Sequence, residues 1–225
     1  MKEAPLLLHG ITLGSWHVPS FIVYTWIVTA LIVIMSLAVR ANLKEIPTGL
    51  TNLVEFMIGG LRDFTTETMG PHGLDYFAII GTVVFFILFC NLIGIIPGFE
   101  SPTANINTTG ACAVTVVVMT HLIGVGKHRF KYIKHFLGPV WWLAPLMFPI
   151  EVIGHFARVL SLSLRLFGNI KGEDLFILTL FTLVPFFIPA IVVVQGLQIF
   201  TAFVQTFVFV LLTMLYLSGA AEHAH

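Results

Sequence analysis

The residues best suited to chemistry are charged and polar side chains set into an apolar stretch, Pro149 to Leu175, which reads PIEVIGHFARVLSLSLRLFGNIKGEDL. A charged side chain in hydrocarbon is costly, so such residues usually face a protein interior or a water path. Arg165 has no acidic residue three or four positions away that could pair with it on a helix. The stretch therefore predicts a functional site with Arg165 at its centre.

Helical periodicity gathers most of these polar residues on one side. At about 100° per residue, one sector of roughly 120° holds seven of them: Glu151, His155, Arg158, Ser161, Arg165, Asn169 and Glu173. Asp174 lies about one residue's rotation away from this stripe. Such a stripe can line a hydrated groove, or it can hold helices together through internal pairs such as Glu151 with His155. Both interpretations stay open.

The chemistry of arginine limits what Arg165 can do. Its guanidinium stays protonated at physiological pH, so it cannot relay a proton. It favours the ionised form of a nearby carboxylate, and it can form an electrostatic barrier between two water-filled regions. Because its own helix offers no suitably placed carboxylate, we expect the partner to come from another helix or another subunit.

Composition places the chain in the membrane. Hydrophobic residues make up 57% and charged residues 10% of the 225 positions, whereas soluble domains average about 25% charged. The zero formal net charge gives no sign of a nucleic-acid partner. Cys90 and Cys112 lack metal-ligand or redox spacing, so we expect neither a metal nor another cofactor. The first twenty residues lack a clear signal-peptide pattern, and we expect them to be a retained arm.

The apolar runs predict an all-α integral membrane protein, with residues 1–225 as a single membrane domain. Five spans are expected at about 19–39, 76–96, 110–125, 150–181 and 188–217. Thr51 to Phe64 has the pattern of an amphipathic helix lying at the interface. The last two spans exceed a bilayer core of roughly 30 Å, so we expect them to tilt strongly, or to bend near Gly168 and Gly172.

The segment 126–136 carries four basic residues within a short loop: Lys127, Arg129, Lys131 and Lys134. Short loops rich in lysine and arginine stay in the cytoplasm. With five spans, this loop predicts an N-terminus outside and a C-terminus inside. An RNA-binding patch is the alternative, but the adjoining span already explains the charge.

The last span has polar residues of its own, among them Gln195, Gln198, Thr201 and Gln205. Gln198 and Gln205 are seven positions apart and therefore share a helix face. They can join helices by hydrogen bonds, or face the polar stripe and line a proton or water path. The two interpretations are compatible.

Three segments carry a resemblance to a known family: SLSLRLFGNIKGEDL, VQTFVFVLLTMLYLSGA and NLIGIIPGFESPTANINTT. Together they resemble subunit a of F-type ATP synthases, and the similarity covers nearly the whole chain. The resemblance implies a proton-translocating stator subunit, not an enzyme, in a bacterial inner (plasma) membrane. The N-terminus would be periplasmic and the C-terminus cytoplasmic. Expected partners are the c-ring rotor subunits, the peripheral-stalk b subunits, the remaining synthase subunits and the lipid bilayer, with no nucleic acid.

The resemblance also implies two offset half-channels against the c-ring, with Arg165 facing the ring carboxylate and blocking a direct proton leak. It assigns proton translocation to eight residues: Arg165, Asn169, Asp174, Glu173, Gln198, Gln205, Glu151 and Ser161. Glu151 and Ser161 would lie toward the cytoplasmic half-channel, and Asn169 and Asp174 on the half-channel open to the outside. Gln198 would face these two from the last helix, and Gln205 would lie near the arginine. Ungapped matching favours Asp174 as the working acid of that outside half-channel. Helical phase favours Glu173, which stays as a second acid.

Two other classes of membrane protein fit the sequence less well. A stand-alone ion channel or secondary transporter is the main alternative, but the sequence shows no inverted repeats or paired broken helices. A haem-bearing redox subunit needs axial histidines on membrane helices. Only His121 and His155 lie in apolar spans, and their positions form no matching pair. Whether protons or sodium ions are carried stays open, because in the resembled family the ring's site largely selects the ion.

Overall fold

The computed structural model describes residues 11–13, 16–42, 49–96, 98–128, 144–183 and 188–222. Two short strands, β1 (Ile11–Leu13) and β2 (Trp16–Val18), pair antiparallel ahead of the first helix. The helices are α1 (Ser20–Ala41), α2 (Leu50–Met69), α3 (Phe77–Ile93), α4 (Ile106–His128), α6 (Ala144–Leu183) and α7 (Ile188–Glu222). Two 3-10 helices, η1 (Pro71–Tyr76) and η2 (Pro102–Ala104), precede α3 and α4.

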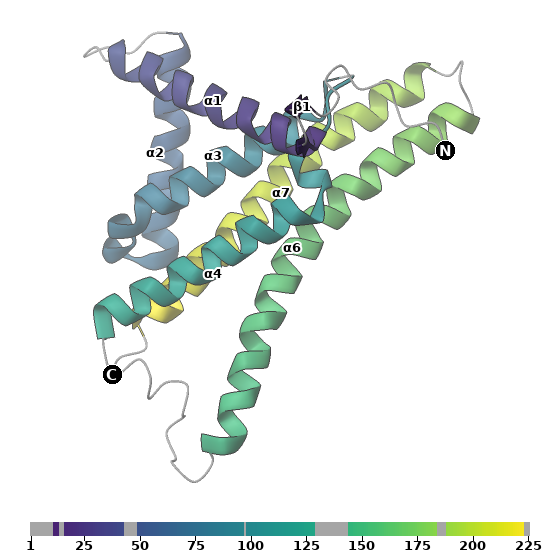
Figure 1. The fold of residues 1–225 in the computed structure, drawn as a ribbon. Coiled ribbons are helices and arrows are strands. Elements are labelled where there is room, and N and C mark those ends of the chain that lie inside the picture. The colour runs from purple at the N-terminus through teal and green to yellow at the C-terminus, as the bar shows by residue number, and fades with distance from the viewer. Residues whose placement is uncertain are drawn as a thin grey trace.

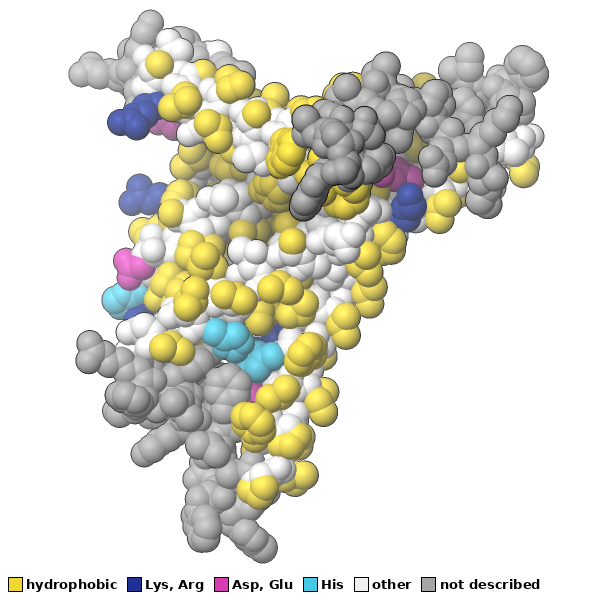
Figure 2. All heavy atoms as spheres, viewed as in Figure 1, with side chains coloured by type: hydrophobic (Ala, Val, Ile, Leu, Met, Phe, Trp, Pro, Cys, Tyr) yellow, Lys and Arg dark blue, Asp and Glu magenta, His cyan; other side chains and the backbone are white. Residues whose placement is uncertain are grey.

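Within these ranges, five helical segments are long and apolar enough to cross a membrane: Ser20–Ala41, Pro71–Ile93, Ile106–Lys127, Pro145–Leu180 and Val192–Ala220. The expected all-α membrane fold is confirmed, and the β1–β2 hairpin is an addition that the sequence analysis did not predict. Apolar side chains cover much of the outer surface of the long helices (Figure 2), as expected for chains whose solvent is lipid.

The core lies where α3, α4, α6 and α7 meet. Six buried side chains form its larger cluster: Ile87, Ala113, Val116, Leu162, Leu166 and Phe209. α4 packs along both α6 and α7, and α3 packs on α7 (Figure 1). Because Leu162 and Leu166 are 1% and 0% exposed, this part of α6 is fixed in the core. The turn of α6 that carries Arg165 is therefore held firmly in place.

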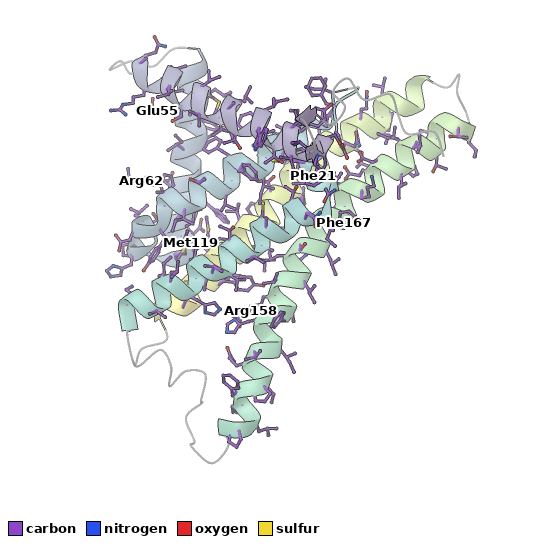
Figure 3. The ribbon with its side chains drawn as sticks, viewed as in Figure 1. Phe21, Glu55, Arg62, Met119, Arg158 and Phe167 are labelled. Carbon is purple, nitrogen blue, oxygen red and sulfur yellow. The ribbon has the colours of Figure 1, made fainter. Side chains whose placement is uncertain are left out.

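The last two helices are unusually long. α6 has 40 residues and α7 has 35, or roughly 60 Å and 52 Å of helix, well beyond a hydrocarbon layer of roughly 30 Å. Figure 1 shows α6 diverging from α4 and α7 over its first part and running beside α7 over its second. Phe167 lies near this change of direction (Figure 3), next to one of the two glycines at which a bend was predicted.

The helix expected at the interface is α2, which is longer than the predicted 51–64 stretch. It runs across the side of the bundle where α1 ends and α3 begins (Figure 1). Thr51, Val54 and Thr65 are buried, whereas Phe56 is 80% exposed. Gly49 and Gly70 flank the helix with φ angles of 61° and 72°, a region that favours glycine because it has no Cβ.

A buried network of polar groups fixes the loop between α3 and α4. Ser101 Oγ donates to the carbonyl of Cys90 at 2.8 Å, and Thr103 Oγ1 donates to Asn91 Oδ1 at 2.7 Å. Tyr24 on α1 donates to the carbonyl of Gly98 at 3.3 Å. The loop is thereby held against both α1 and α3.

Two sequence-based expectations stay predictions. One is that residues 1–225 form a single membrane domain. The other is that segment 126–136 is a cytoplasmic loop. Residues 129–136 of that segment lie outside the described residues.

Candidate functional site

Arg165 stands apart from the other charged residues of α6. The helix carries Glu151, Arg158, Arg165, Lys171, Glu173 and Asp174, and of these only Arg165 is in the exposed class. Among the described residues, Arg165 has no hydrogen-bond or ion-pair partner. Its neighbours Leu160 and Leu164 are 56% and 50% exposed. The middle of an apolar helix therefore presents an unpaired cation on its outer side.

One turn after Arg165, an amide pair joins the two long helices. Asn169 Nδ2 on α6 donates a hydrogen bond to Gln205 Oε1 on α7. Gln205 is only 3% exposed, and its Nε2 has no hydrogen-bond partner among the described residues. The structure thus brings two of the predicted residues together and leaves one buried donor available on Gln205.

The polar contacts continue along α7 away from Arg165. Gln198 lies two turns before Gln205 and is 7% exposed. Thr201, between them, lies close to Glu173 on α6, and its hydroxyl donates a hydrogen bond to the carbonyl of Leu197 at 3.0 Å. Glu173 therefore faces α7, on the side that helical phase indicated.

Asp174 belongs to a different group of charges. Its electrostatic neighbours are Lys171 on α6 and Glu100 in the α3–α4 loop. Glu100 accepts a hydrogen bond from the hydroxyl of Ser20 on α1. Figure 2 shows acidic and basic side chains together at this end of the molecule. This group of charges lies where α1, the α3–α4 loop and α6 come together.

Sequence reasoning did not assign Glu100 to the site. A signal was present, because Glu100 is the one charged residue in the stretch NLIGIIPGFESPTANINTT. Its neighbours, however, come from α1 and α6, at positions far away in the sequence. Only tertiary packing shows that this acid approaches Asp174.

The residues before Arg165 have other partners. Glu151 Oε1 lies 3.4 Å from His155 Nε2, one turn along the helix. The ring of His155 meets the ring of His121 on α4 at a centroid distance of 4.4 Å. The Arg158 guanidinium lies 5.3 Å from the centre of the Tyr216 ring on α7. Ser161 lies on the exposed side of α6, apart from this group.

The contact between His121 and His155 was not indicated by their positions in the sequence. They are paired in space because α4 packs along α6. Their rings touch edge to face at an interplanar angle of 75°, which leaves no room between them for a haem plane. Among the described residues, no group of three or more histidine, cysteine, aspartate or glutamate side chains is placed to hold a metal ion.

Comparisons with known proteins identify the family of this chain. The family model described as ATP synthase A chain matches residues 22–218. The protein called ATP synthase subunit a in Geotalea uraniireducens is 53% identical over 204 residues, which cover 91% of this chain and 88% of the relative. Proteins of the same name in Geobacter sulfurreducens and Trichlorobacter lovleyi are 51% and 50% identical with the same coverage. The chain belongs to the ATP synthase A chain family.

Proposed function

We propose that this chain forms two offset proton half-channels against a ring of c subunits, with Arg165 as the barrier between them. As a member of its family, the chain is a multi-pass, proton-translocating membrane subunit that assembles with other ATP synthase subunits and is not a catalytic subunit. The observation that carries the proposal is the exposed, unpaired Arg165 in the middle of an apolar span.

A cation in this position requires a partner from outside the chain. A guanidinium facing lipid alone would be costly, and the described residues offer it no acid. A carboxylate on the ring would neutralise Arg165 when it passes. Because Arg165 stays protonated and favours the ionised form of that acid, the carboxylate must release its proton before it reaches Arg165. It can take up a new proton only after it has passed.

The half-channel open to the outside runs along the second half of α6. Its outermost groups are Glu100 and Asp174, in the charge group that also includes Lys171. The path continues through the polar side chains between α6 and α7, which are Glu173, Thr201, Gln198, Asn169 and Gln205. Asp174 is the principal acid and Glu173 the second. The unpartnered Nε2 of Gln205 gives water a binding position at the inner end of this path.

The cytoplasmic half-channel lies along the first half of α6, with Glu151 and Ser161 as its assigned residues. The basic segment 126–136 sets the direction, so that the N-terminus is periplasmic and the C-terminus cytoplasmic in the inner membrane of a bacterium. The c-ring and the peripheral-stalk b subunits are the proposed direct partners. A stand-alone transporter is not proposed, because the family acts within an assembled complex.

The test compares wild type with Arg165→Ala in membrane vesicles that contain the whole complex. ATP-driven proton pumping should be abolished, while assembly stays normal and passive proton leak persists or rises. Arg62→Ala is the matched control, because Arg62 is an exposed arginine on α2 (Figure 3) and its loss should leave pumping unchanged. Normal pumping by Arg165→Ala would overturn the proposal.

A further inference from the structure

The contact between His121 and His155 joins α4 and α6 near the ends of these helices that flank the basic segment. The ring centroids are 4.4 Å apart, and Glu151 Oε1 lies 3.4 Å from His155 Nε2. Both histidines are half-buried. Figure 2 shows histidine side chains in contact near its centre, with acidic atoms directly below them. Three proton-binding groups therefore lie next to one another across two helices.

The charged and titratable groups around this pair come from each neighbouring helix. On α6 they are Glu151 and Arg158, whose charges act on His121. On α7 it is Tyr216, which lies under the Arg158 guanidinium. Farther along α4, Lys127 lies over the ring of Tyr76 in η1 at 5.9 Å. Arginine side chains are not deprotonated in proteins, so within this cluster we assign proton exchange to the two imidazoles and Glu151.

We propose that His155 and His121, together with Glu151, relay protons between the cytoplasm and the half-channel on that side of Arg165. This inference rests on the proposed function and its orientation. An imidazole can accept a proton on one ring nitrogen and release one from the other, so no other co-reactant is needed. During ATP synthesis, a proton released by the ring passes to Glu151 and the histidine pair and then to the cytoplasm. ATP-driven pumping reverses this path.

A purely structural contact would not require these residue types. Apolar aromatic rings pack edge to face equally well, without the cost of desolvating a polar ring between membrane helices. The long helices of this chain use apolar side chains for most other packing contacts. Two imidazoles beside an acid therefore indicate proton transfer.

The experiment uses inverted membrane vesicles that contain the assembled complex, because the bath then contacts the cytoplasmic side. ATP-driven acidification is measured at bath pH values from about 5 to 8, where histidine ordinarily changes charge, and is divided by the rate of ATP hydrolysis. Wild type should show an inflection in this range. His155→Phe keeps an aromatic ring against His121 but cannot carry a proton, and His155→Gln keeps polarity.

Both variants should lose the inflection and pump about tenfold more slowly. This is less than the hundredfold or more that a positioned acid–base group typically supplies, because water can partly replace the imidazole. His121→Gln should behave in the same way. The matched control is His72→Gln, since His72 is exposed on η1, and it should keep the wild-type rate and profile.

A wild-type rate and pH profile in His155→Phe would overturn the relay and reduce the contact to packing. If a variant lowers the amount of assembled complex, the shape of the pH profile still decides, because it does not depend on amount. Arg165→Ala in the same assay separates the two proposals. If Arg165→Ala pumps normally, the proposed function is overturned. If Arg165→Ala fails to pump while the histidine variants pump like wild type, only the relay is overturned.

Discussion

The hydrogen bond from Asn169 to Gln205 joins two uncharged residues of the proposed proton path. The amide of Gln205 is almost fully buried, yet its Nε2 has no partner among the described residues. Buried polar groups are nearly always satisfied, often by an ordered water. A water bound here would lie one helical turn from Arg165. Neither amide titrates, so the role that follows for the pair is to hold water and align α6 with α7.

The two adjacent acids of α6 have different surroundings, and this predicts different roles. Asp174 lies near Glu100 and Lys171 in the outer group of charges, whereas Glu173 lies close to Thr201 on α7. We expect Asp174→Asn to slow ATP-driven pumping more than Glu173→Gln does, because Asp174 is the acid that connects the outer charges with the path. Both variants should be measured in vesicles at equal amounts of complex.

Glu55→Gln is the control for this comparison, since Glu55 is an exposed acid on α2 (Figure 3). Its pumping rate should equal that of wild type. The opposite ranking of the two α6 variants would make Glu173 the principal acid of the outside half-channel.

The loop between α3 and α4 carries Glu100, the outermost acid of the proposed path. A Cβ at Gly94 would lie 2.6 Å from Ser101 Cβ and 3.2 Å from Ser101 Cα and N. Backbone atoms cannot move aside as a flexible side chain can, so the segment carrying Glu100 would have to shift. Gly94→Ala should therefore cost about 1–3 kcal/mol of stability, as overpacking typically does.

Gly81→Ala, within α3, is the control, because a Cβ at Gly81 meets nothing within 4 Å. Heat resistance of the assembled complex and the pumping rate at low temperature measure the two effects. Gly94→Ala should lower both, and Gly81→Ala should lower neither. Equal behaviour of the two variants would show that the loop does not position Glu100.

Much of this arrangement could be predicted from the sequence, since a membrane fixes helix length and a helix fixes which residues share a side. The apolar runs predicted the five spans, and the periodicity of α6 correctly placed Asn169 and Glu173 on one face. Contacts between distant segments could not be predicted in this way. Periodicity orients a side chain on its own helix but does not say which neighbour it meets. Ser20 with Glu100, and His121 with His155, are two such contacts.

The whole chain has equal numbers of acidic and basic residues, but not every charged side chain lies beside a partner. Its formal net charge is zero, and its partly buried charges on α6 lie beside oppositely charged, polar or aromatic groups. Arg165 is the exception, exposed among Leu160 and Leu164 on the outer side of the bundle. Among the charged residues of α6, which the structure describes throughout, Arg165 is thus the exposed one that a partner in the assembled complex would neutralise.

Because Arg165 has no partner among the described residues, an acid introduced beside it on α6 should change how the complex works. Ser161 lies four residues before Arg165 on the exposed side of α6, and an acid at that spacing, N-terminal to the base, pairs favourably on a helix. Ser161→Asp should therefore neutralise Arg165 within the chain and compete with the ring carboxylate. ATP-driven pumping should be largely lost, with the complex still assembled. Ser161→Asn is the control, since asparagine has nearly the same shape as aspartate without the charge. Any effect of losing the Ser161 hydroxyl then appears in both variants, and Ser161→Asp should pump far more slowly than Ser161→Asn. Equal pumping by the two variants would mean that Arg165 does not depend on an acid supplied by the ring.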